Sequence, residues 1–150
     1  MTPRSIRRFL APALLALAAC SNTVQATTYT MFRDPDCGCC EAWADHIRAE
    51  AEAEIVENET ADIAEIKTAH GVPQELWSCH TMIVDGYVIE GHVPAADIAR
   101  LLEQRPEGVR GLAVPGMPIG SPGMEMDGRT QAYHVIAFGD TWQSVFASYE

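Results

Sequence analysis

The sequence lacks the motifs that mark several large enzyme classes. It contains no His-Glu-x-x-His zinc motif, no glycine-rich phosphate-binding loop, no Gly-x-Ser-x-Gly elbow and no paired-carboxylate motif. It is also poor in positive charge, with 10 basic residues against 21 acidic ones and a net charge of −11. A field of that sign repels nucleic acid and anionic membranes and favours the approach of cations. Hydrolase, nucleotide-binding and nucleic-acid-binding functions therefore have no support in the sequence.

No apolar run is long enough to cross a bilayer comfortably, although a short one lies at residues 9–19. Three arginines precede it: Arg4, Arg7 and Arg8. A positive segment followed by a short apolar one predicts an export signal. The expected location is the bacterial cell envelope, in the periplasm, where free thiols are exposed to oxidation. Removal of the signal leaves seven of the ten basic residues and all 21 acidic ones, a net charge of −14.

The sequence leaves two alternatives for the site at which this export segment is cleaved. Leu-Ala-Ala-Cys at residues 17–20 has the form of a lipobox, which predicts a lipid on Cys20 and, with it, the one expected membrane contact. This form is favoured because Cys20 follows the apolar run directly. Val-Gln-Ala at residues 24–26 instead suits ordinary signal peptidase and a soluble product. We assign residues 1–26 to the export signal and a tether, and residues 27–150 to one domain.

Three of the remaining cysteines lie within four positions, in Cys-Gly-Cys-Cys at residues 37–40. Thiolates are soft ligands for Cu(I), Zn(II) and iron–sulfur clusters, and they are also the nucleophiles of disulfide exchange. Cys37 and Cys40 have the Cys-x-x-Cys spacing of thioredoxin-like redox sites, so they are the catalytic pair if the site is redox-active. Two sulfurs are enough for a dithiol catalyst, so the third, Cys39, favours a metal site. A purely structural interpretation remains, with Cys37–Cys40 and Cys39–Cys79 as inert disulfides.

The order of the expected elements indicates a thioredoxin-like α/β fold. Alternation, helical periodicity and turn residues predict strands at 28–32, 55–59, 81–84 and 87–90 and helices at 39–53, 62–69 and 94–105. An Asp-Gly pair joins the last two strands as a hairpin. The resulting order, β-α-β-α-β-β-α, is the thioredoxin arrangement.

This order places the cysteines in a loop that opens onto the N-terminus of the first helix. The helix dipole and its unpaired N–H groups stabilise a thiolate there, which lowers the pKa of a cysteine. Trp43, Ile47 and Ala51 recur at four-residue spacing and are expected to face the core. The Glu-rich run at residues 50–65 is expected to be a solvated helix face and loop.

The last third of the chain is rich in proline, glycine and methionine. We call residues 112–127 the methionine loop, because their sequence has neither helical nor strand periodicity and predicts an ordered loop. A C-terminal strand is predicted at 131–138. Trp142 and Phe146 are expected to pack on the core from a terminal tail.

Further candidate ligands lie outside the Cys-Gly-Cys-Cys motif. In a thioredoxin-like fold the segment before the hairpin, here Cys79-His80, lies opposite that motif, so four sulfurs meet at one place. Four soft ligands suffice for Cu(I) or Zn(II). The thioethers of Met117 and Met124 each close a Pro-Gly turn and are either soft ligands or apolar plugs. Met126 is the weaker candidate of the three.

The other histidines and methionines are ranked by their place in the expected elements. His80 is the first histidine candidate, followed by His134, which faces either the core or the site, and then by His92. Two histidines are expected to be exposed on helices, His46 and His70. Two methionines are expected in the core, Met31 and Met82.

Three separated motifs resemble those of the CopG-type copper-resistance proteins. They are Cys-Gly-Cys-Cys before a Trp-containing helix, Ser-Cys-His-Thr at residues 78–81, and Val-Pro-Gly-Met-Pro-x-Gly-Ser-Pro-Gly-Met-Glu at residues 114–125. The resemblance runs from about residue 28 to residue 149. It implies a thioredoxin-like fold, a periplasmic location and copper bound at the cysteines, with a role in detoxification through interconversion of Cu(I) and Cu(II). The matching positions are Cys37, Cys39, Cys40, Cys79, Met117 and Met124.

We therefore predict a cell-envelope copper-binding protein that acts in copper resistance. The expected metal is Cu(I), as one or several ions, with zinc as the second choice because four soft ligands also suit it. Other periplasmic copper-handling proteins are the expected partners. The predicted metal ligands are Cys37, Cys39, Cys40, Cys79, His80, Met117 and Met124.

The alternative is an enzyme, a thiol–disulfide oxidoreductase with Cys37 as nucleophile and Cys40 as the resolving thiol. The expected fold and the helix N-terminus favour it. Cys39, the Cys79-His80 pair and the methionine loop have no role in such an enzyme. Thr81 also occupies the position before the hairpin where an oxidoreductase of this fold is expected to have a proline.

Overall fold

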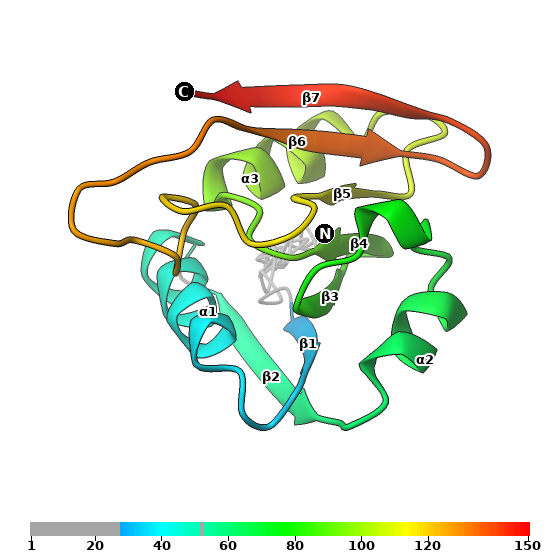
Figure 1. Ribbon diagram of the computed structural model, residues 1–150. Helices are drawn as coiled ribbons and strands as arrows, with labels where there is room; N and C mark the ends of the chain where they lie inside the picture. The colour runs from blue at the N-terminus through cyan, green and yellow to red at the C-terminus, as the bar shows by residue number, and fades with distance from the viewer. Residues whose placement is uncertain (1–27, 52) are drawn as a thin grey trace, which may run out of the picture.

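The computed structural model describes residues 28–51 and 53–150 (Figure 1). The predicted export signal, the lipobox at Cys20 and the tether lie outside the described residues. Within the described ranges, no helix is both long enough and apolar enough to cross a membrane.

One seven-stranded mixed sheet and three α-helices make up the described chain, in the order β2-β1-β3-β4-β5-β6-β7 across the sheet. Strand β1 is parallel to β2 and β4 is parallel to β5, whereas the other neighbours are antiparallel. The elements are β1 (Thr28–Arg33), α1 (Gly38–Ala51), β2 (Glu54–Glu59), α2 (Ile63–Ala69), the 3-10 turn η1 (Gln74–Leu76), β3 (His80–Val84), β4 (Tyr87–Glu90), α3 (Ala95–Gln104), β5 (Gly111–Ala113), β6 (Tyr133–Phe138) and β7 (Gln143–Tyr149).

The elements up to the end of α3 follow the expected order β-α-β-α-β-β-α. Helix α1 crosses over between the parallel strands β1 and β2, and packs with α3 on one side of the sheet, while α2 contacts β1 and β3 from the other side (Figure 1). The β3–β4 hairpin turns at Asp85 and Gly86, which both have positive φ, as a two-residue hairpin turn of this type requires.

Three residues of α1 were predicted to face the core, and the prediction is confirmed for two of them. Trp43 and Ile47 are completely buried. The prediction for Ala51 is wrong, because α1 ends at that residue and its last turn is exposed. Trp43 also donates a hydrogen bond of 2.9 Å from Nε1 to the Val93 carbonyl, which joins α1 to the segment that enters α3.

The C-terminal part contains two strands that the sequence did not predict. Strand β5 has only three residues, and β7 replaces the expected tail, pairing antiparallel with β6 at the edge of the sheet. Trp142 is exposed in the turn before β7 and does not pack on the core, contrary to prediction. Phe146 is half-buried, with the Arg100 guanidinium 3.9 Å from its ring centre. Edge strands face solvent, so β7 lacks the strong alternation that would mark it.

Met31 and Met82 are completely buried, which confirms their place in the core. The expected exposure of His46 and His70 is wrong, because both are half-buried. The His70 ring lies 6.2 Å from the Phe32 ring, and His46 Nε2 is buried without a hydrogen-bond partner among the described residues.

Candidate metal centre

The Cys-Gly-Cys-Cys segment forms the turn between β1 and the first residues of α1. Cys37 N donates to the Asp34 carbonyl at 3.2 Å, and Cys40 N donates to the Cys37 carbonyl at 3.1 Å. Cys40 is completely buried, while Cys37 and Cys39 are half-buried. The cysteines therefore lie at the helix N-terminus, as the local sequence predicted.

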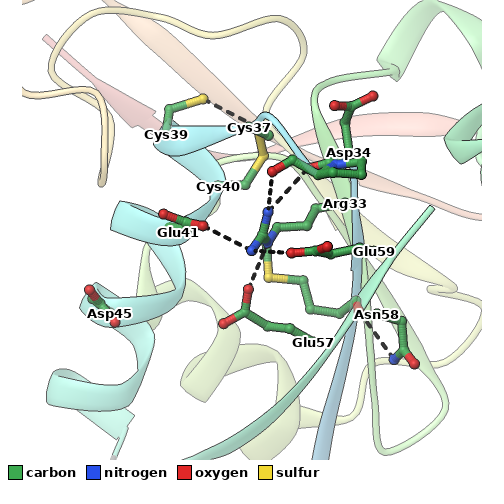
Figure 2. A network of polar contacts seen from close by, with 12 residues as sticks. Arg33, Asp34, Cys37, Cys39, Cys40, Glu41, Asp45, Glu57, Asn58 and Glu59 are labelled. Carbon is green, nitrogen blue, oxygen red and sulfur yellow. Dashed lines mark hydrogen bonds and ion pairs between the residues drawn. A yellow bond between two sulfur atoms is a disulfide. The ribbon is translucent and has the colours of Figure 1, made fainter. Parts of the chain in front are cut away.

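A buried arginine at the end of β1 anchors this turn from below (Figure 2). Arg33 Nη1 donates to the carbonyls of Asp34 and Pro35, at 3.1 and 3.2 Å. Its other nitrogens form ion pairs of 2.7 Å with Glu57, 2.9 Å with Glu41 and 3.1 Å with Glu59. The hydrogen bond from Arg33 to Glu57 raises the pKa of the guanidinium above its usual value. The guanidinium thus connects the turn that precedes the cysteines to both β2 and α1.

Four sulfur atoms from two distant segments meet at this turn. The side chains of Cys37, Cys39, Cys40 and Cys79 place their sulfurs within 4.8 Å of one another, and we call them the sulfur cluster. Cys37 and Cys40 are joined by a disulfide, and Cys39 and Cys79 are free thiols. Cys39 Sγ lies 3.6 Å from Cys37 Sγ. The second disulfide of the purely structural interpretation, Cys39–Cys79, is therefore not present.

A completely buried ion pair fixes the segment that carries Cys79. Lys67 Nζ lies 2.5 Å from Glu90 Oε1, and the two side chains are 2% and 0% exposed. The same Glu90 oxygen accepts a 2.6 Å hydrogen bond from Ser78 N, and Glu90 Oε2 accepts one of 2.7 Å from Thr81 Oγ1. The residues on both sides of Cys79-His80 are thereby held by one carboxylate.

The Cys79 thiol is protonated at neutral pH in the absence of a metal. Burial, followed by the neighbouring Cys39, raises its pKa to about 12. Thiolate is the form that binds metals. A metal ion that binds Cys79 must therefore displace a proton.

His92, the third-ranked histidine candidate, contacts Cys79. Its Nε2 lies 3.0 Å from Cys79 Sγ, and its Nδ1 lies 2.7 Å from the Pro122 carbonyl oxygen. A two-residue hairpin at Asp85-Gly86 pairs Thr81 with Glu90, and continuation of that register brings His92 opposite Cys79. The contact between Cys79 and His92 could therefore have been predicted from the register of the hairpin.

His80 contacts the same sulfur. Its Nδ1 is 3.3 Å from Cys79 Sγ, and its ring is packed between the rings of Trp43 and His92, at centroid distances of 4.3 and 5.2 Å. Burial lowers the pKa of His92 and lowers that of His80 far more. Both imidazoles are therefore neutral at pH 7, the form that binds a metal.

The methionine loop lies over the start of α1, and one of its thioethers reaches the sulfur cluster. Met117 Sδ is 4.0 Å from Cys39 Sγ, although the side chain is 52% exposed. Met124 is half-buried in the same loop, where its N–H and carbonyl bind Ser121 and Gly120. Met126 is exposed and forms an isolated bridge with Arg129.

His134 does not join the cysteines. It is exposed on β6, and its Nδ1 lies 3.0 Å from Ser148 Oγ on β7. It lines an open surface hollow together with Met117. The sequence left open whether His134 faces the core or the site, and in the structure it faces neither.

Replacing Gly123 by alanine is expected to destabilise the protein and to lift the methionine loop from α1. Gly123 has a φ of +79°, and a Cβ there would lie 2.6 Å from Trp43 N and 2.9 Å from the Cys39 carbonyl oxygen. A left-handed residue with a side chain costs about 1–2 kcal/mol, and forced overpacking adds about 1–3 kcal/mol. Urea unfolding measures the loss against Gly128→Ala, which has a φ of +71° but open space around its Cβ. Equal losses would show that the loop does not press on α1.

Comparison with known proteins gives two solved structures described as copper resistance protein CopG, form 2 and form 1. The first is 41% identical, covers 84% of this chain and 100% of its own, and superposes with a TM-score of 0.79. The second is 42% identical, covers 83% of this chain and 98% of its own, and has a TM-score of 0.78. The chain belongs to the CopG family. No curated protein matches.

A family model described as a protein of unknown function, DUF411, matches residues 76–124 of this CopG-family chain. That segment contains Cys79, His80, His92 and Met117. The resemblance stated from the three sequence motifs is thus confirmed. A CopG family membership and a cysteine cluster able to hold a metal together support a copper-related function.

Proposed function

We propose that this protein binds Cu(I) at the sulfur cluster and acts in copper resistance in the bacterial cell envelope. The observation that carries the proposal is the meeting of Cys37, Cys39 and Cys40 with Cys79, which is remote in sequence, within 4.8 Å. Sulfur ligands select Cu(I) among the common metals, and zinc is the second choice. The naming of two solved relatives as copper resistance proteins supports copper over zinc.

Full use of the cluster requires its reduced state. The Cys37–Cys40 disulfide takes up two electrons and two protons to give two thiols, after which all four sulfurs are available. Copper then displaces protons from the thiols it binds. Cys39 and Cys79 remain free in the disulfide form, so the number of sulfur ligands depends on the redox state.

We also propose that the first part of the chain is a thioredoxin-like unit extended by three strands. The order β-α-β-α-β-β-α and the arrangement β2-β1-β3-β4 support this assignment, with β1 and β2 parallel and β3 and β4 antiparallel. Such a unit places the cysteine turn and the segment before β3 at the same end of the sheet. The methionine loop leaves β5 and leads to β6, and it lies over that end (Figure 1).

The methionine loop covers the copper in this proposal. Met117 completes the site on its open side, next to Cys39. Met124 is part of the same covering loop. His80 contacts Cys79 and completes the site next to that cysteine. A thioether is a soft ligand that cannot be lost to disulfide formation, which suits an oxidising compartment. The exposure of Met117 also leaves a route for copper to and from other periplasmic copper-handling proteins.

Substituting Met117 by leucine is expected to weaken Cu(I) binding by about tenfold, near the lower end of the effect of losing a supporting ligand contact. Leucine keeps the volume but not the sulfur, so the free energy of unfolding should change by less than about 1.5 kcal/mol. Competition with a Cu(I) chelator measures the affinity. Met126→Leu is the matched control, since Met126 lies in the same loop with a similar exposure, 42% against 52%. The same affinity for both variants would exclude Met117 as a ligand.

We further propose that the protein interconverts Cu(I) and Cu(II). Each conversion moves one electron between the copper and an external one-electron carrier. Repeated oxidation and reduction of the loaded protein tests it, with metal content and free thiols counted after each cycle. Loss of copper, or irreversible loss of thiols, would contradict this role.

The second candidate function is thiol–disulfide exchange, which the Cys37–Cys40 disulfide at the start of α1 favours. Attack of an external thiolate on Cys37 would release Cys40 as the leaving thiolate, and a second thiol would complete the exchange. An insulin-reduction assay separates the two functions. Turnover that persists in Cys39→Ser and under copper chelation would favour the enzyme over the copper protein.

A further inference from the structure

The two edges of the sheet differ in charge. Strand β2 forms one edge and β7 forms the other, and each has a single neighbour in the sheet among the described residues. Strand β2 contains three glutamates in six residues: Glu54, Glu57 and Glu59. An edge strand presents N–H and C=O groups that can pair with another chain, and charged side chains are a common protection against such pairing. The β2 edge is therefore protected.

The β7 edge lacks this protection. Its seven residues, Gln-Ser-Val-Phe-Ala-Ser-Tyr, contain no charged residue, no proline and no glycine. Short uncharged segments with β-branched and aromatic residues and without proline are typical of strands that add to other strands. Val145 of β7 is 58% exposed. Figure 1 shows β7 along the outer edge of the sheet, with no described element beyond it.

Contacts with α3 hold β7 in its extended conformation. The Arg100 guanidinium lies 3.9 Å from the centre of the Phe146 ring and donates a 3.0 Å hydrogen bond to the Phe146 carbonyl. The Tyr149 hydroxyl donates to Asp97 at 2.7 Å, and the Tyr149 ring stacks on Tyr133 at a centroid distance of 4.8 Å. Because β7 is already ordered, a strand that binds to it does not have to supply the cost of ordering it.

One irregularity interrupts β7. The register with β6 shifts between Val135 and Ile136, so that Phe146 has no partner on β6. The carbonyl of Phe146 is bound to Arg100 and is not available to another strand. Bulges of this kind twist an edge strand and limit its pairing. We therefore expect pairing over short runs on either side of Phe146, which gives a reversible complex and not a fibre.

An apolar hollow borders the same edge. Its lining includes Pro115, Met117, Pro118 and Ile136. Ile136 pairs with Val145 across β6 and β7, so these two side chains lie on the same face of the sheet. None of these five residues carries a charge, although the whole chain has a net charge of −11. Apolar, uncharged surface next to an open strand edge is typical of the centre of an interface.

The charges of the chain favour a second copy as the occupant. A basic partner would be attracted to the acidic faces of the molecule, and β7 has no charge that could direct such a partner to itself. Two copies of the chain repel each other where acidic faces meet, and this repulsion is smallest at β7. Two antiparallel β7 strands related by a two-fold axis offer each other matching donors and acceptors without burying a charge.

We propose that β7 is a self-association surface, at which two copies of this chain join their sheets through antiparallel β7 strands. This inference is independent of the copper function, so either can fail without the other. Ile136 lines the hollow together with Met117 and pairs with Val145. The second copy would therefore lie next to the hollow that the exposed side of Met117 lines.

Sedimentation velocity from micromolar to millimolar concentration tests the proposal. The Cys20→Ala chain is used with a reductant, so that neither a lipid nor intermolecular disulfides contribute, and all variants share the same export segment. We expect the mass to rise from one copy to two and no further. Val145→Lys should weaken self-association at least about fivefold, because the two-fold axis repeats each unfavourable cross-strand pair. Val56→Lys is the matched control, since Val56 is an exposed valine on the β2 edge, 44% against 58%.

Amide hydrogen exchange of the unsubstituted Cys20→Ala chain separates strand pairing from other contacts and does not depend on how a variant folds. The β7 amides should exchange more slowly at high than at low protein concentration, whereas the β2 amides should not change. A chain that stays monomeric over the whole range would overturn the proposal. So would a dimer that Val56→Lys weakens as much as Val145→Lys, or one whose β7 amides gain no protection.

Discussion

Glu90→Gln is expected to lower the free energy of unfolding by about 3–5 kcal/mol, because it leaves the buried Lys67 without its counter-charge. Both side chains are almost completely inaccessible, and the ion pair is 2.5 Å long. A buried ammonium without a carboxylate must either remain charged at high cost or lose its proton. Urea unfolding gives the loss as a shift of the midpoint at constant slope.

Two further variants make this prediction specific. The double variant Lys67→Met with Glu90→Gln removes both charges, so it should be more stable than Glu90→Gln alone, while the amide oxygen introduced at position 90 would still accept from Ser78 N. Asp140→Asn breaks the exposed pair with Arg110 and should change the free energy of unfolding by less than about 1 kcal/mol. If the double variant were less stable than Glu90→Gln, the unpaired ammonium would not be the cause of the loss, contrary to this reasoning.

The same carboxylate connects stability to the metal centre. Glu90 binds Ser78 N and Thr81 Oγ1, which flank Cys79-His80. In Glu90→Gln protein that remains folded, the position of Cys79 is less firmly fixed. We therefore expect a second effect beyond stability, a weaker Cu(I) affinity, which Asp140→Asn should not have.

Cys79→Ser is expected to reduce Cu(I) affinity by at least about 100-fold, beyond the range for loss of an outer contact. Cys79 is the one cysteine of the sulfur cluster that is not part of the Cys-Gly-Cys-Cys turn, and it faces both His80 and His92. Its loss removes the one sulfur ligand that the segment before β3 contributes. Competition of the fully reduced protein with a Cu(I) chelator measures the affinity.

Two other variants serve as comparisons for Cys79→Ser. Cys39→Ser should also weaken Cu(I) binding, whereas His134→Gln, which changes an exposed histidine away from the sulfurs, should leave it unchanged. Retention of Cu(I) affinity within about threefold in Cys79→Ser would mean that the Cys-Gly-Cys-Cys turn binds copper alone, because a true ligand costs more than an outer contact.

The cysteine arrangement could be predicted because each step depended on local signals. Helical spacing of Trp43 and Ile47 placed the cysteines at a helix N-terminus, and the Asp-Gly hairpin placed the Cys79 segment opposite them. The disulfide between Cys37 and Cys40 also follows from the spacing of two residues between them. Element order was therefore sufficient to bring four sulfurs together.

The supporting contacts could not be predicted, because they depend on tertiary packing. Lys67 lies in a short polar helix, and nothing in its local sequence shows that it points into the protein. Glu57 and Glu59 read as part of a solvated acidic run, yet both bind the buried Arg33 (Figure 2). Charged residues are normally exposed, so periodicity assigns them to the surface unless the partner is known.

The contact between Met117 and Cys39 spans 78 positions in a segment without periodicity. Its composition predicted an ordered loop but not its place. The glycines decide that place: Gly123 approaches the Cys39 carbonyl so closely that no side chain fits between them. A sequence alone shows where a glycine allows conformational freedom, but it does not show which group that glycine approaches.

An anaerobic Cu(I) titration of the fully reduced protein against a competing chelator, with metal content by mass spectrometry, tests whether this is a copper site. Cys20→Ala is used throughout, so that the four cysteines of the sulfur cluster are the ones that report. We predict tight binding of one or more Cu(I) per chain, and clear weakening in Cys39→Ser. Weak binding that is indifferent to Cys39 would contradict the account and would make the Cys37–Cys40 dithiol the functional unit.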